Sequence, residues 1–150
     1  MQRIIKFRAW DTAHKKMFSP YEMGQDELQL NPDGRGFFNA SSLSPKLSQY
    51  YPHMIPLQYT GLKDKNGAEI YEGDRLSVTR SPEHMKRLIA DAPNPMVYVC
   101  EWVNMGFVLK SLYPYPFNES KFFYHIESDC EVIGNIWENP ELLEAKEYDK

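Results

Sequence analysis

The sequence predicts a mainly β protein: a small barrel with additional short strands and two short helices. Ten tyrosines, eight phenylalanines and eleven prolines among 150 residues favour short strands and turns over long helices. Apolar and polar residues alternate with a period of two in several short segments, as in half-buried strands. Glycine-containing turns separate these segments, so most neighbouring strands are expected to be joined as hairpins.

The first predicted strand runs to about Trp10, because Ile5, Phe7 and Ala9 alternate with Lys6, Arg8 and Trp10. A returning strand is expected to begin at Met17-Phe18. From Ser19 to Pro56 the alternation weakens, although Asn31 to Gly34 predicts a turn. A structureless stretch of this length is unusual inside a compact domain, so short strands are expected there without defined positions.

Residues 58–74 form the most regular turn segment of the chain. Asn66-Gly67 is expected to supply the positive φ angles of a tight hairpin, and Asp64 to open that turn by bonding its own backbone. Glu72-Gly73-Asp74 makes a second break. A half-buried strand is then predicted over residues 75–79.

The sequence Ser81-Pro82-Glu83 predicts a helix start, with serine as N-cap and proline at the first helical position. This helix is expected to end at about Ala90, before the next prolines. The remaining predicted elements are strands over residues 96–103, 107–112, 122–126 and 131–133 and a C-terminal helix of about two turns that begins at Asn139-Pro140.

The net charge of −4 is unevenly distributed. Residues 131–150 contain six acidic and two basic side chains, which accounts for the whole net charge, while residues 1–16 contain five basic side chains and one acidic one. Such asymmetry can steer a partner, or the two ends can satisfy each other within or between subunits. The alternative is two separately solvated faces, since exposed ion pairs are weak.

The cysteines and the apolar segments indicate a cytoplasmic protein without a membrane span. Cys100 and Cys130 fall in predicted strands and are expected to be buried free thiols, although their relative position is not fixed by the sequence. Ile4-Ile5 is too short for the apolar region of a secretory signal. No segment approaches the roughly 20 apolar residues of a membrane helix.

Three segments, in this order, span nearly the whole chain: Lys6-Phe-Arg-Ala-Trp-Asp11 with Lys15-Lys-Met17, Gln58 to Asp74, and Glu131-Val-Ile-Gly-Asn-Ile-Trp-Glu-Asn-Pro-Glu-Leu-Leu143. Together they resemble the YopX family of small bacteriophage and prophage proteins. The resemblance implies a β-rich fold with an SH3-like barrel in its C-terminal part, a tendency to form homo-oligomers, and a place in the bacterial cytoplasm. It implies no established activity, cofactor or catalytic residue.

We therefore expect one YopX-like domain over residues 1–150, with an N-terminal β region at 1–57 and the SH3-like barrel plus C-terminal helix at 58–150. The leading functional prediction is a phage accessory protein that is not an enzyme and binds a host or phage macromolecule. Leu142 and Leu143, surrounded by glutamates, are hypothesised to contact the basic N-terminal strand of a neighbouring subunit.

The first alternative is a nucleic-acid-binding barrel. Small barrels bind single strands by stacking bases on exposed aromatic rings beside cationic side chains, and Arg8 with Trp10 would suit that role. The neutral body and the acidic tail speak against it, because phosphate binding depends mainly on lysine and arginine. Core packing of Trp10 is the favoured interpretation.

The second alternative is a metal-dependent hydrolase that uses Asp64 and Asp74, since nuclease-type sites use converging carboxylates. Turn chemistry explains these aspartates better. The four histidines, His14, His53, His84 and His125, show no metal-ligand spacing, so neither a metal nor another cofactor is expected.

Overall fold

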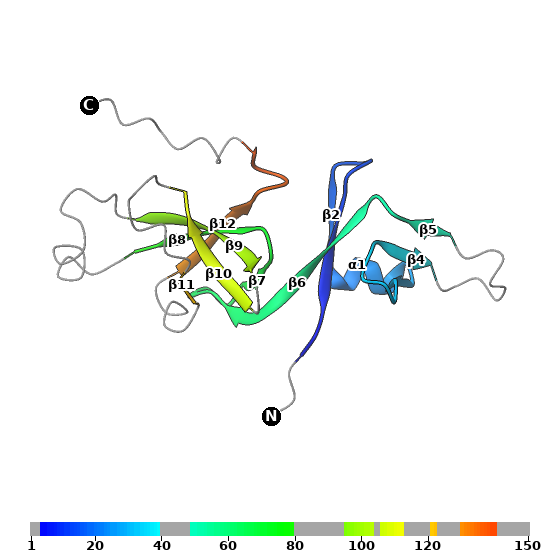
Figure 1. Cartoon of the computed structure of the whole chain (residues 1–150), viewed down its shortest axis with the longest axis horizontal. Helices are drawn as coiled ribbons and strands as arrows, with labels where there is room; N and C mark the ends of the chain where they lie inside the picture. Colours follow the sequence, from blue (N-terminus) through cyan, green and yellow to red (C-terminus); the bar gives the residue numbers. More distant parts are fainter. Residues whose placement is uncertain are drawn as a thin grey trace. The chain divides into compact units, whose positions relative to one another are not determined.

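A computed structural model describes residues 4–39, 49–79, 95–103, 106–112, 121–122 and 130–140 of the chain (Figure 1). The chain divides into two compact units, Met1–Tyr59 and Thr60–Lys150. The boundary falls within strand β6 (Met54–Lys63), two residues beyond the subdivision expected from the sequence. Each unit has its own apolar core, and the two are described separately.

The elements of the first unit are β1 (Phe7–Asp11), β2 (Lys16–Phe18), α1 (Pro20–Gln25), β3 (Leu28–Leu30), β4 (Phe37–Asn39), β5 (Tyr50–Tyr51) and the beginning of β6. β1 lies between β2 and β6, and β4 lies between β3 and β5, with all these pairs antiparallel. The predicted strand ending near Trp10, the returning strand at Met17-Phe18 and the turn at Asn31 to Gly34 are confirmed; Gly34 donates its N–H to the Asn31 carbonyl at 2.8 Å.

The core of the first unit is small and draws on both sheets and the helix. Its fully covered side chains are Ala9, Met23, Phe37 and Met54, with Phe7, Phe18, Leu28, Leu30 and Tyr51 packed around them. Burying a side chain such as Phe37 stabilises the fold by about 2 kcal/mol or more. This core fixes α1 against the strands, because Met23 is the buried residue of the helix.

Helix α1 lies in the Ser19 to Pro56 segment, where we expected short strands without defined positions. Ser19 caps it: its Oγ accepts from the Glu22 N–H at 3.2 Å, and Glu22 Oε2 accepts from the Ser19 N–H at 2.8 Å. Pro20 occupies the first helical turn. The two predicted helices, which begin near Ser81 and Asn139, lie almost wholly outside the described residues, so the predicted pair of helices is not matched in the part that is described.

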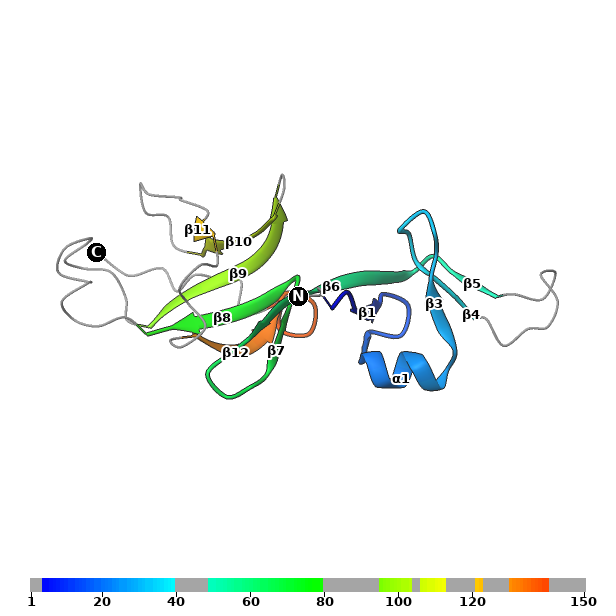
Figure 2. The same ribbon diagram turned by 90° about the horizontal axis from the view of Figure 1, so that it is seen from below.

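The second unit contains the end of β6 and the strands β7 (Glu69–Tyr71), β8 (Asp74–Val78), β9 (Met96–Val103), β10 (Gly106–Ser111), β11 (Lys121–Phe122) and β12 (Cys130–Asn135). The last five form one antiparallel sheet in the order β11-β10-β9-β8-β12, which curls into half a barrel (Figure 2). The strands predicted over 75–79, 96–103, 107–112 and 131–133 are confirmed within about two residues. Residues 123–126 of the remaining predicted strand are outside the described part.

The core of the second unit gathers side chains from β7 to β10 and β12: Ile70, Leu76, Val78, Met96, Tyr98, Cys100, Leu109 and Cys130. Both cysteines are buried free thiols, as predicted. β8 separates their strands, β9 and β12, in the sheet. Cys130 stands opposite Val78, and Arg75 is opposite Val99, so the cysteines are not a cross-strand pair.

The turn between β6 and β7 differs from the prediction in one respect. Gly67 has a φ of +84°, but Asn66 does not have a positive φ; among the described residues other than glycine, only Lys15 and Glu27 do. Gly67 donates to the Asp64 carbonyl at 3.0 Å, and Asp64 donates to the Ala68 carbonyl at 2.8 Å. The chain therefore uses a turn closed by a left-handed glycine, so only that residue needs a positive φ.

None of the helices in the described ranges is long and apolar enough to cross a lipid bilayer.

Candidate functional site

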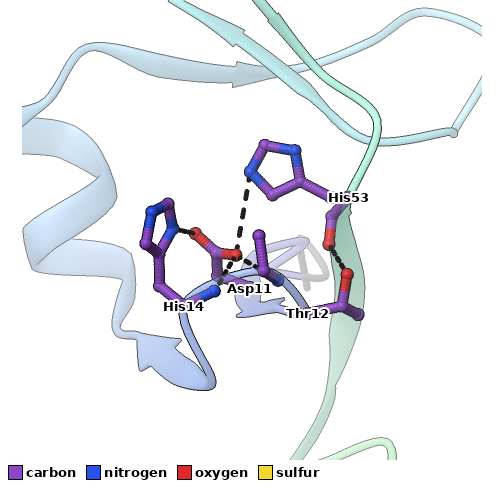
Figure 3. A network of polar contacts seen from close by, with 5 residues as sticks. Asp11, Thr12, His14 and His53 are labelled. Atoms are coloured by element: carbon purple, nitrogen blue, oxygen red, sulfur yellow. Dashed lines mark hydrogen bonds and ion pairs between the residues drawn. The ribbon is translucent and has the colours of Figure 1, made fainter.

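Three side chains that can bind a cation meet in the first unit: Asp11 at the end of β1, His14 in the turn after it, and His53 immediately before β6 (Figure 3). Asp11 Oδ2 lies 2.8 Å from His14 Nδ1, and Asp11 Oδ1 lies 3.7 Å from His53 Nε2. One ligand atom from each of the three residues lies within 4.8 Å of the other two. Figure 3 shows the Asp11 carboxylate reaching toward both imidazole rings.

Backbone hydrogen bonds hold the carboxylate in place. Asp11 Oδ1 accepts from the N–H groups of Ala13 at 2.8 Å and His14 at 3.0 Å, which is the geometry of a turn opened by its own aspartate. Lys15, with a φ of +54°, completes the turn into β2. The sequence folds this way locally because aspartate after a strand can replace the missing backbone acceptors.

His53 is attached to the same turn from the other side. Thr12 donates both its N–H, at 3.1 Å, and its Oγ1, at 3.0 Å, to the His53 carbonyl. The next residue, Met54, stands opposite Asp11 in the antiparallel pairing of β1 and β6. The Tyr51 ring packs edge-on against the His53 ring with centroids 5.9 Å apart. Pairing of these two strands therefore brings His53 to Asp11.

Burial alone would raise the pKa of Asp11, but hydrogen bonds from the His14 side chain and from the N–H groups of His14 and Ala13 outweigh it and lower the pKa below 3.8. The carboxyl is thus ionised at neutral pH. The Asp11 side chain is 5% exposed, that of His53 33% and that of His14 76%. The cluster therefore has a buried anionic base and an imidazole open to solvent.

Sequence reasoning missed this cluster because His14 and His53 are far apart in the chain and neither belongs to a recognisable ligand spacing. Only the register of β1 against β6 brings them together. A signal was present in Asp11, which follows a strand and precedes a polar turn that contains His14. The partner strand could not be identified from a weak pattern between Ser19 and Pro56.

The residues of the nucleic-acid alternative lie in β1. Trp10 is 4% exposed, so its ring is packed within the protein and no face of it is open to a base. Arg8 is half-buried, and both side chains have contacts within the protein. This placement favours the packing interpretation of Trp10.

The residues of the hydrolase alternative are engaged by backbone N–H groups. Asp64 Oδ1 accepts from Asn66 and Ala68 at 2.8 and 2.9 Å, and its Oδ2 accepts from Val132 at 2.9 Å. Asp74, 1% exposed, accepts from the Tyr71 N–H at 2.8 Å. Within the described ranges, Asp11, His14 and His53 form a group of three potential metal ligands. Neither Asp64 nor Asp74 belongs to such a group there.

Some large apolar side chains are exposed. Ile4 and Ile5, just before β1, are 67% and 65% exposed, and Tyr21 on α1 is 74% exposed. Among the described residues of the second unit, Trp102 and Ile133 are the exposed examples. The predicted oligomer contacts, Leu142 and Leu143, lie outside the described residues.

Comparisons with known proteins give a matching family model and a similar solved structure. The family model described as YopX protein matches residues 6–144. The crystal structure of protein EF1440 from Enterococcus faecalis is 30% identical in sequence, with a TM-score of 0.57, and the alignment covers 95% of this chain and 100% of that one. No curated protein matches the sequence.

Proposed function

Because the chain belongs to the YopX family, we propose that it is a phage or prophage accessory protein of the cytoplasm that works without catalysis, as a homo-oligomer that binds a host or phage macromolecule. Neither alternative gains from the structure: Trp10 is packed inside the first unit, and the carboxylates of Asp64 and Asp74 accept backbone hydrogen bonds.

The main observation in favour of an oligomer is the exposure of Ile4 and Ile5. They are consecutive, and both are about two-thirds exposed. Neighbouring exposed apolar residues of this size are typical of a surface that an interaction covers.

Charge supports a second copy of this chain as the partner of that segment. Residues 1–16 have five basic side chains and one acidic one, and residues 131–150 have six acidic and two basic ones. The acidic C-terminal segment of one copy, with Leu142 and Leu143, would therefore complement the basic, apolar start of another copy in both charge and apolar character.

We also propose that the second unit is an SH3-like barrel. Two observations support this. The five-stranded antiparallel sheet β11-β10-β9-β8-β12 is curled, and Gly73, with a φ of +80°, allows a tight turn before β8. Small barrels need curved strands joined by tight turns. An experimental structure of the full chain would test the barrel. Closure of the five-stranded sheet by β12 or by β7 would support it, and a sheet left open at both edges would contradict it.

Native mass spectrometry of the full chain tests the oligomer. We expect the wild-type protein to be oligomeric, and the double variant Ile4→Glu/Ile5→Glu to dissociate, because the added charges cannot be buried in an interface without partners. Removal of residues 138–150 should also give a smaller species. The matched control is Ile133→Glu, an exposed isoleucine of the second unit, which should leave the mass unchanged.

A monomeric wild-type protein at micromolar concentration would overturn the oligomer. The same number of subunits in the wild type, the double variant and the truncated chain would overturn the assigned contact. Binding to a macromolecule is tested separately by affinity purification from phage-infected cells beside an unrelated protein with the same tag. Enrichment of one partner that reconstitutes with the purified chain supports it, and its absence argues against it.

A further inference from the structure

We propose that Asp11, His14 and His53 bind a transition-metal dication of the zinc type. The three residues offer one carboxylate oxygen and two imidazole nitrogens, the donor types that zinc prefers besides thiolate. They lie within the first unit, and the proposal does not depend on the proposed function.

The spacing of the donors fits a small ion. In a tetrahedral zinc site with metal–ligand distances of about 2.0–2.2 Å, neighbouring donor atoms are roughly 3.4 Å apart. Here Asp11 Oδ2 lies 2.8 Å from His14 Nδ1, Asp11 Oδ1 lies 3.7 Å from His53 Nε2, and one donor atom from each residue lies within 4.8 Å of the other two. Binding one ion would require both rings to turn toward it, and the His14 and His53 side chains, 76% and 33% exposed, are not enclosed by the core.

The His53 ring gives the strongest indication. Its Nε2 points at Asp11 Oδ1 but lies 3.7 Å away, beyond hydrogen-bond distance. Its other contacts within the described residues are ring contacts with His14 and Tyr51. An imidazole nitrogen aimed at a carboxylate without bonding to it leaves a position that an ion can fill.

The supporting contacts favour binding without large rearrangement. Two backbone N–H groups hold Asp11 Oδ1, and the two bonds from Thr12 hold the backbone of His53. Such outer contacts orient metal ligands and raise affinity. Among the described residues, the hydrogen-bond partner of Asp11 Oδ2 is His14 Nδ1. A bound ion would take the place of the proton shared between these two atoms.

The donor set also decides the class of metal. Imidazole nitrogens suit zinc, nickel, copper and iron, whereas magnesium and calcium prefer oxygen donors. Three protein ligands leave a coordination position for water. Zinc is therefore the probe, and magnesium is the negative control.

The test is a zinc titration of the metal-stripped full chain, followed by competition with a chromophoric chelator. We expect one zinc ion per chain, with affinity lowered at least about tenfold in His14→Gln and in His53→Gln. Asp11 is kept unchanged because it holds the turn. The double variant His84→Gln/His125→Gln, which removes the two other histidines of the chain, is the matched control and should keep wild-type affinity.

Cobalt substitution gives a second readout that does not depend on the variants. The cobalt spectrum should show nitrogen and oxygen ligation without a thiolate charge-transfer band, since Cys100 and Cys130 are buried elsewhere. Absence of zinc binding, unchanged affinity in both site variants, loss only in the His84/His125 variant, displacement by magnesium, or a thiolate band would each overturn the proposal.

Discussion

Asp64 Oδ2 accepts a hydrogen bond of 2.9 Å from the backbone N–H of Val132, 68 residues further along the chain. The other oxygen of the same carboxylate accepts from Asn66 and Ala68. A single side chain therefore closes the β6–β7 turn and attaches it to β12. At the surface, Lys65 of the same turn also contacts β12, through an ion pair of 2.6 Å with Glu131.

Replacing Asp64 by alanine should lower the free energy of unfolding by about 3 kcal/mol, because three backbone N–H groups lose a charged acceptor in a buried setting. Asp64→Asn should cost less, since its amide oxygen can still accept. Amide hydrogen exchange should show reduced protection at Val132. The matched control is Glu131→Gln, which removes only the exposed ion pair and should cost less than about 1 kcal/mol. Equal losses for Asp64→Ala and Glu131→Gln would contradict this assignment.

Acid should destabilise the protein through Asp11 and Asp64. Burial alone would raise both pKa values, but hydrogen bonds lower them below 3.8. The folded state therefore binds protons less readily than the unfolded chain, so the free energy of unfolding rises with pH between about pH 3 and pH 5. The contribution is fully present above the unfolded pKa and is lost as pH falls through the folded pKa. Melting temperatures should be flat above about pH 5 and should fall steeply toward about pH 3.

The slope of that acid transition identifies its source. In Asp64→Asn the titrating group is gone, so the fall in melting temperature between about pH 5 and pH 3 should be shallower than in the wild type. Glu131→Gln serves as the control, since it removes only the exposed carboxylate that pairs with Lys65. An unchanged slope in Asp64→Asn would show that other groups govern the acid transition.

Removing the cap of α1 should weaken the first unit. Ser19→Ala deletes the oxygen that accepts from Glu22, and an N-cap serine is worth about 1 kcal/mol. The cap also lowers the pKa of Glu22 to about 2, through bonds from the Ser19 backbone and hydroxyl and from Lys16. In Ser19→Ala the pKa of Glu22 should rise, but only in part, because the backbone N–H of residue 19 still donates to its carboxylate; NMR titration measures this rise. Tyr21→Phe, which removes an exposed bond to Gln25, should leave the pKa of Glu22 unchanged.

The sequence predicts the longer strands well and the first unit poorly. β9 is predicted residue for residue, because it has eight residues, five of them valine, tyrosine or tryptophan, which is long enough to establish a period of two. β3, β4 and β5 have two or three residues each, which is too short to establish any period. Helix α1 was predictable in principle: Ser19-Pro20-Tyr21-Glu22 has the same serine–proline start as the helix expected at Ser81.

The candidate site lies beyond what local pattern can predict. The role of Asp64 follows from its own sequence neighbours, since an aspartate two residues before Asn66-Gly67 opens a turn whatever surrounds it. The meeting of His14 and His53 depends instead on which strands pair and in which register. Tertiary pairing therefore decides the chemistry of the first unit, and the burial of Trp10 beside it.

The loop between β3 and β4 supplies a matched test of packing against backbone strain. Gly34 and Gly36 both have positive φ angles, +78° and +65°. A Cβ at Gly34 would meet nothing within 4 Å, whereas at Gly36 it would lie 2.6 Å from the Tyr51 carbonyl oxygen. Gly34→Ala should therefore cost about 1 kcal/mol, the strain of a left-handed alanine. Gly36→Ala should cost at least about 2 kcal/mol more, because the backbone of β5 must move. Urea denaturation of both variants measures the difference, and equal costs would mean that β5 can move away from Gly36 without loss.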